Sequence, residues 1–325
     1  MRAAAIGRNY VRAIIAVVIV FFVAIASQQD RSVFAAQPAD PSLGLDKEWS
    51  HWEKEVDRIG ARAAYAEFRD YYTANNSSMV HALAHQLGDI IFNKDGLDGL
   101  DICDSAFGYA CYHQFLARAL AAYGVDVLPE LGLHCSGKYR DDPRDCFHGI
   151  GHGLREYFGS DRLLDALRQC ERFSQFRSCE NGVFMDYNVP LWFNGTSTPY
   201  AKARPLDTAH PYAPCDTSVP DEYKISCYYS LPHLWPQYGG WDFDKIKQLC
   251  AGAPGNFASA CYNGIPVDMV GNLNYDQTKI IAACATMPDS AKIQCISSTE
   301  YYVHVLGYDS CRIAKSAGLE RSYCR

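Results

Sequence analysis

The chain has 325 residues, of which 48% are hydrophobic and 21% are charged, and its formal net charge is −7. This composition is typical of a globular protein with a sizeable core, and it excludes extensive disorder. The acidic balance argues against a protein that coats nucleic acid, because such a protein needs lysine and arginine against phosphate.

The N-terminal segment has the features of an export signal. Three early arginines precede the apolar run AIIAVVIVFFVAIA at residues 13–26, which is short for a membrane span. We predict that residues 1–36 are a signal peptide or an uncleaved N-terminal anchor, and that residues 37–46 are a linker. The protein is then exported to the periplasm or the extracellular space. It meets a membrane only through such an uncleaved segment.

Residues 47–325 are predicted to form one domain of α-helical hairpin repeats. The first unit lacks cysteine. Its segment DKEWSHWEKEVDRIGARAAYAEFRDYY at 46–72 has the spacing of one long amphipathic helix, and MVHALAHQLGDIIF at 79–92 begins a second. Farther along, the stretch at 189–214 is rich in proline and aromatic residues, and we interpret it as an insertion whose role is open.

The fourteen cysteines all follow this first unit, and they fall into seven consecutive pairs between Cys103 and Cys324. The members of a pair are 8 to 13 residues apart, while first members follow one another at intervals of 27 to 45 residues. An even number of cysteines behind an export signal favours disulfides, and intervals near 34 residues are typical of two-helix repeats. The sequence thus predicts an all-α fold, an α-solenoid or α-toroid, with one disulfide per repeat.

The paired cysteines also resemble those of a known family. CDSAFGYACYHQFLARALAAYG at 103–124 is similar to one unit of the disulfide-stitched Sel1-like and tetratricopeptide-type α-repeats of exported bacterial proteins. The resemblance covers residues 103–324. It implies a curved solenoid whose concave face binds a protein or another ligand, and it implies no catalytic residues.

Two histidine motifs stand out because they share one spacing. His81 and His85 lie in HALAHQLGD, and His148 and His152 lie in HGIGHGLRE, 67 residues farther along the chain. His113 occupies the matching place in the unit between them. Residues four apart share one face of a helix, which is how two imidazoles reach one metal ion. We predict that these five histidines bind metal, and that the glycines in CFHGIGHGL allow a close approach of helices or of a ligand.

One carboxylate follows each motif on the same helical face: Asp89 after the first and Glu156 after the second. We predict that each either orients a metal-bound histidine or handles protons. Zinc, iron and copper are all compatible with imidazole ligands.

Two functions remain open at this point. One is an exported metalloprotein with a histidine-lined pocket, whose enzymatic form is a metal-dependent oxygenase or hydrolase. Its repeated histidines resemble, in organisation only, the di-iron centre of HEAT-repeat hydroxylases, whose His-Glu dipeptides are absent from this sequence. The other is a solenoid without chemistry that binds an unknown protein or small molecule. A buried histidine that merely hydrogen-bonds to the backbone is the simplest alternative for His113.

Overall fold

The computed structural model describes residues 42–75, 80–139, 142–193, 199–201, 203–321 and 323–324. The predicted signal or anchor at 1–36 lies outside these residues, as do residues 37–41 of the predicted linker. Within the described ranges, no helix combines the length and the hydropathy needed to cross a membrane.

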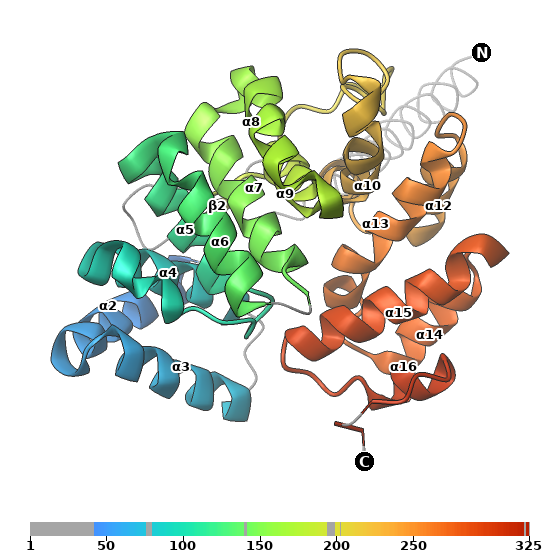
Figure 1. Ribbon diagram of the computed structural model, residues 1–325. Coiled ribbons are helices and arrows are strands. Elements are labelled where there is room, and N and C mark those ends of the chain that lie inside the picture. Colours follow the sequence, from blue (N-terminus) through green and yellow to red (C-terminus); the bar gives the residue numbers. More distant parts are fainter. Residues whose placement is uncertain are drawn as a thin grey trace, which may run out of the picture.

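The fold is helical, as predicted (Figure 1). The α-helices are α2 (Ser42–Ile59), α3 (Ala61–Asn75), α4 (Val80–Asp95), α5 (Ala110–Tyr123), α6 (Leu128–Lys138), α7 (Arg144–Phe158), α8 (Leu163–Cys170), α9 (Ser178–Asn188), α10 (Lys224–Leu234), α11 (Pro236–Gly239), α12 (Phe243–Ala251), α13 (Phe257–Asn272), α14 (Gln277–Ala285), α15 (Asp289–Val305) and α16 (Cys311–Ser316). Short 3₁₀ helices are η1 (Gly96–Asp101), η2 (Gly124–Val127), η3 (Ser160–Arg162), η4 (Glu171–Phe176) and η5 (Asp221–Tyr223). Strands β1 (Leu191–Phe193) and β2 (Pro199–Ala201) pair antiparallel inside the predicted insertion.

The first unit differs from its prediction. The segment 46–72 is not one helix but two, because Gly60 lies between α2 and α3 with φ +85°. Glycine adopts this left-handed conformation at little cost, and a residue in this conformation ends a right-handed helix. In addition, α2 begins at Ser42, so its first turns occupy part of the segment that was predicted as a linker.

The predicted cysteine pairing is confirmed. All fourteen cysteines lie in the described part of the chain, and each is bonded to its neighbour in sequence, with Cα atoms 5.2 to 5.6 Å apart. Four bridges join the end of one helix to the first turns of the next: those of α6 with α7, α8 with α9, α12 with α13, and α14 with α15. Each such bridge can contribute about 2–4 kcal/mol to stability.

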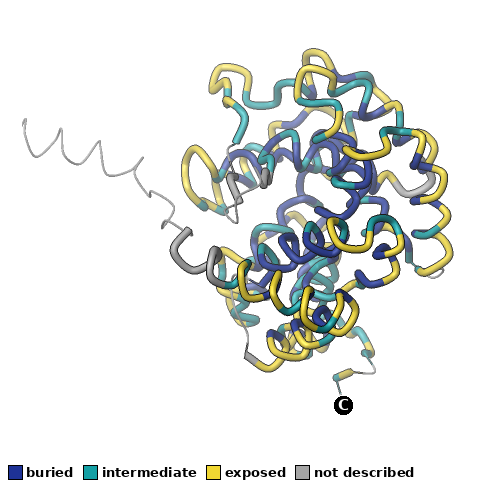
Figure 2. The backbone as a smooth tube through the Cα atoms, turned by 90° about the vertical axis from the view of Figure 1, so that its left-hand side faces the viewer, coloured by how far each residue is buried: buried dark blue, intermediate teal, exposed yellow. Residues whose placement is uncertain are grey.

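The second helices of successive units form an inner layer. They pack against one another in chain order: α4, α5, α7, α9, α10, α13 and α15. Figure 1 shows the helix pairs following one another around a centre, so that the first and last units both lie at the lower side of the view. The buried part of the chain runs through the middle of the molecule, with exposed turns around it (Figure 2).

Glycines allow these inner helices to approach backbone to backbone. A Cβ atom added to Gly88 would lie 2.2 Å from the carbonyl oxygen of Cys111, and one added to Gly151 would lie 2.0 Å from that of Cys179. At Gly264 the same distance, to the oxygen of Tyr229, is 1.8 Å. No real side chain fits at such distances, so alanine would push the helices apart. Close contact between inner helices is therefore one reason for the glycines in the histidine motif.

The last inner helix, α15, contacts the units that contain α5 and α7. The backbone N–H of Gly108 donates to the carbonyl oxygen of Val305 at 3.1 Å, and the hydroxyl of Tyr301 donates to the carboxylate of Asp145. These contacts join α15 to the region around α5 and α7, which is compatible with the predicted helix-hairpin toroid.

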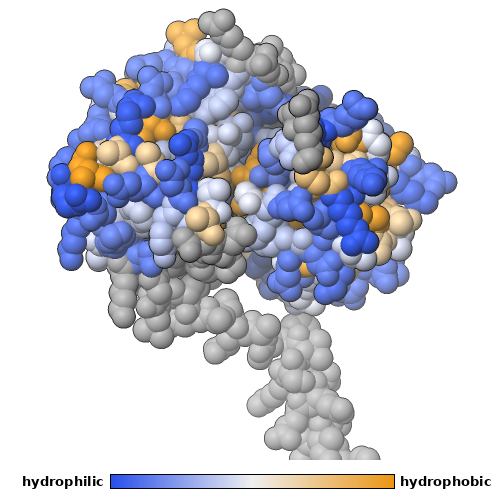
Figure 3. Space-filling view, turned by 90° about the horizontal axis from the view of Figure 1, so that it is seen from below, coloured by the Kyte–Doolittle hydropathy of each residue, from blue (hydrophilic) through white to orange (hydrophobic). Residues whose placement is uncertain are grey.

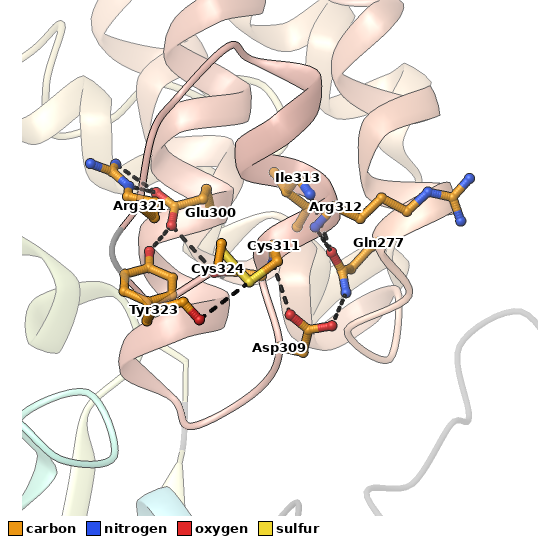
Figure 4. The surroundings of a disulfide bond; sticks show 10 residues. Gln277, Glu300, Asp309, Cys311, Arg312, Ile313, Arg321, Tyr323 and Cys324 are labelled. Atoms are coloured by element: carbon orange, nitrogen blue, oxygen red, sulfur yellow. Dashed lines mark hydrogen bonds and ion pairs between the residues drawn. A yellow bond between two sulfur atoms is a disulfide. The ribbon is translucent and has the colours of Figure 1, made fainter.

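The C-terminal unit is held by polar contacts around the disulfide between Cys311 and Cys324 (Figure 4). The buried carboxylate of Glu300 accepts from Arg321 at 2.7 Å, and the side-chain oxygen of Gln277 accepts from the backbone N–H of Arg312 at 2.9 Å. The surface seen from below is largely hydrophilic, and its apolar residues are scattered in small groups (Figure 3).

Candidate metal centre

The five predicted histidines lie together, on three consecutive inner helices. Helix α4 carries His81 and His85, α5 carries His113, and α7 carries His148 and His152. His85 and His113 are buried, and the other three are partly exposed. They make two groups of three whose ligand atoms lie within 4.8 Å of one another, and both groups include His113.

The first group is His81, His85 and His113. Nε2 of His85 lies 3.3 Å from Nε2 of His81 and 3.3 Å from Nδ1 of His113. The other ring nitrogen of His81, Nδ1, lies 2.7 Å from the carbonyl oxygen of Phe107. A carbonyl only accepts, so this Nδ1 carries the proton and the lone pair of Nε2 is turned toward the other two rings.

The second group is His113, His148 and His152. Nε2 of His152 lies 3.0 Å from Nε2 of His148, and the centroid of the His113 ring is 4.7 Å from that of His152. On the far side of the His152 ring, Nδ1 lies 3.5 Å from a carboxylate oxygen of Asp186. Histidines that bind metal through one ring nitrogen commonly have a carboxylate beside the other ring nitrogen.

Two separations between nitrogens in the first group and one in the second are close to those around a single ion. Imidazole nitrogens about 2.0–2.1 Å from a tetrahedral ion lie about 3.3–3.4 Å from each other. Two of the measured separations are 3.3 Å and the third is 3.0 Å. The histidines are therefore already near the spacing that coordination requires.

Burial favours the neutral form of four of the five rings. It lowers the pKa of His81, and it lowers the pKa values of His85, His113 and His148 well below the usual value. Neighbouring histidines add to the effect, because a second positive charge in the cluster is unfavourable. Neutral imidazole is the form that binds metal, so the cluster is ready for a cation at neutral pH.

The structure places the two predicted carboxylates beside charged partners. Asp89 accepts from Asn93 at 3.1 Å and pairs with Arg118 at 2.8 Å. Burial and the nearby Asp186 raise the pKa of Glu156 to about 7. Their roles in orienting histidines or moving protons stay predictions.

Sequence analysis missed Asp186 and a further histidine, His233, which is buried. Nδ1 of His233 lies 2.8 Å from a carboxylate oxygen of Asp268, and its proximity contributes to the lowered pKa of His148. The two His–Asp pairs share one register. Each histidine stands six residues after the second cysteine of its unit, and each aspartate stands seven residues after the second cysteine of the next unit. Aligning the units on that cysteine would have found both pairs.

No family model, curated protein or solved structure matches this chain. The resemblance to Sel1-like repeats therefore stays a prediction, and the function has to be derived from the site.

Proposed function

We propose that the protein binds a divalent transition metal through its histidine cluster and acts as an exported metalloprotein. The observation that carries this proposal is the convergence of five histidines from α4, α5 and α7, with ring nitrogens at 3.0 to 3.3 Å. Burying polar groups such as His85 and His113 is costly, and apolar residues would fill a core better, so these histidines point to a function.

The donor set limits the metal. Every cysteine is in a disulfide, so no thiolate is available and imidazole nitrogen is the donor that the cluster offers. Imidazole suits zinc, copper and iron. Seven disulfides are also typical of an oxidising compartment, which supports export.

The enzymatic form of the proposal is a metal-dependent hydrolase or oxygenase. Three protein ligands leave a position on the ion for water or substrate, as in catalytic rather than structural sites. His81, His148 and His152 are partly exposed, so solvent reaches each group. A bound ion would make water a stronger nucleophile, and Glu156, with a pKa of about 7, suits proton transfer at neutral pH.

Elemental analysis of protein purified without a histidine tag tests the proposal. We expect stoichiometric zinc, copper or iron in the natural protein and, in the double variant His148→Ala with His152→Ala, loss of the metal that these two histidines hold. His210→Ala is the matched control, because His210 is exposed and lies outside the cluster. Intact disulfides and an unchanged circular dichroism spectrum would show that the double variant is folded. Protein that stays free of metal when zinc, copper or iron is supplied would contradict the proposal and favour a binding module.

A further inference from the structure

His113 occupies a special place among the five histidines, because it belongs to both groups of three. It is the one cluster histidine on α5, and α5 lies between α4 and α7. One nitrogen cannot bind two ions at once. If both groups hold metal, the His113 ring serves them through different nitrogens.

The two edges of the His113 ring face different helices. Nδ1 points to α4, where it lies 3.3 Å from Nε2 of His85. Cδ2 is on the opposite side of the ring and faces α7: a Cβ atom added to Gly149 would lie 3.3 Å from it. Nε2 is bonded to Cδ2, and from this we infer that it faces the α7 side, which carries His148 and His152.

Gly149 has a direct part in this arrangement. Its missing side chain lets the His113 ring lie against the α7 backbone, and an added Cβ would also come within 3.0 Å of Leu116. The ring of His113 is then nearly parallel to that of His152, at an interplanar angle of 22°. The glycine next to His148 thus brings one ring within reach of both groups.

We propose that His113 bridges two metal ions, through Nδ1 to an ion held by His81 and His85 and through Nε2 to an ion held by His148 and His152. This inference rests on the metal centre proposed above. A neutral imidazole has one ring N–H, and the second metal–nitrogen bond replaces it. The proton is released to water, and the bridging ring carries a negative charge that partly offsets the two cations.

Copper(II) provides the test, because two copper(II) ions joined by one imidazolate couple their unpaired electrons. We expect two copper ions per chain after loading and dialysis. At low temperature we expect a spin count in electron paramagnetic resonance that is less than half of the copper content. In His113→Ala, any copper that still binds is expected to give a spin count equal to its content.

Single variants of His85 and His152, one from each group, provide a test that does not depend on how well His113→Ala folds. His85→Ala and His152→Ala are each expected to retain one copper with its full signal, while His210→Ala retains the coupled pair. One copper per chain, two copper ions with a full spin count, or coupling that survives in His113→Ala would overturn the bridge but leave the metal centre. No bound copper, zinc or iron would remove the metal centre itself.

Discussion

Two pairs of neighbouring inner helices, α7 with α9 and α10 with α13, share one arrangement but differ at a position that matters for the histidine cluster. In each, a histidine of the first helix meets an aspartate of the second: His152 with Asp186 at 3.5 Å, and His233 with Asp268 at 2.8 Å. Glycine lets the helices approach closely in both, at Gly151 and at Gly264. The His–Asp pair is therefore a recurring feature of the fold.

The difference lies two residues after the second cysteine of the unit. That position holds His148 on α7 and Tyr229 on α10, and the Tyr229 hydroxyl lies 3.1 Å from that of Tyr302. Among the described residues, groups of three possible metal ligands occur on the α7 side only. In the proposed metal centre, a histidine paired with a carboxylate contributes to the site only where further histidines converge on it.

Removal of metal by a chelator is expected to give the largest difference between the α7–α9 region and the α10–α13 region. A metal present at 100 to 1,000 times its dissociation constant stabilises the folded state by about 3–4 kcal/mol. A strong chelator is therefore expected to lower the melting temperature of the natural protein and of His233→Ala. The variant His148→Ala with His152→Ala is expected to respond less, because only the group of His81, His85 and His113 remains. The measurement is thermal unfolding with and without chelator, and an equal response of all three proteins would contradict the difference between the regions.

Adding a methyl group at the glycine contacts is expected to destabilise both regions. Gly151→Ala and Gly264→Ala each place Cβ at or below 2.0 Å from a carbonyl oxygen, so each is expected to cost about 3 kcal/mol in urea unfolding. Only Gly151→Ala is expected to weaken metal binding. Gly137→Ala is the control, because its Cβ meets nothing within 4 Å in α6 and alanine favours a helix. Stability equal to that of the natural protein would refute the close contact.

Asp186 and Asp268 are expected to contribute unequally to metal affinity. Asp186→Asn removes the charge beside His152 and is expected to weaken binding by about 10- to 100-fold, which is typical when the partner of a metal-bound histidine changes. The asparagine keeps an oxygen for Arg155, which pairs with Asp186 in the fold. Asp268→Asn, in the other region, is expected to leave the affinity unchanged. Competition with a metal-sensitive dye measures both, and equal losses would count against the assignment.

The contact between Tyr301 and Asp145, which joins α15 to α7, is expected to depend on pH. Burial, together with Asp142, raises the pKa of Asp145 to about 7. The folded state holds the proton of this carboxyl more tightly than the unfolded state, whose pKa is near 4. Protonation therefore stabilises the fold fully below pH 4, and this stabilisation is lost as the pH rises through 7. Asp145→Asn does not titrate. Between pH 5 and pH 8 it is expected to gain about 2–3 kcal/mol relative to the natural protein, as measured by urea unfolding at both pH values. A constant difference would show that Asp145 is ionised throughout.

Much of this fold follows from local patterns. The order of the cysteines correctly predicts all seven disulfides, and the spacing of His81, His85, His148 and His152 identifies two helical faces that meet. The break at Gly60 was missed because the apolar spacing continues across it. Asp186 was missed because it comes from a different unit than the histidine it contacts, and such a pairing depends on how neighbouring helices are aligned.

X-ray absorption at the metal edge tests the proposed centre most directly. We predict scattering from about three imidazole rings per ion, with nitrogen at about 2.0–2.1 Å and no sulfur. We also predict that the variant His148→Ala with His152→Ala loses the metal held by these two histidines, which lowers the edge intensity per chain, and that the full intensity persists in His233→Ala. A metal bound by sulfur or without imidazole, or an unchanged spectrum in the double variant, would contradict a metal centre at this histidine cluster.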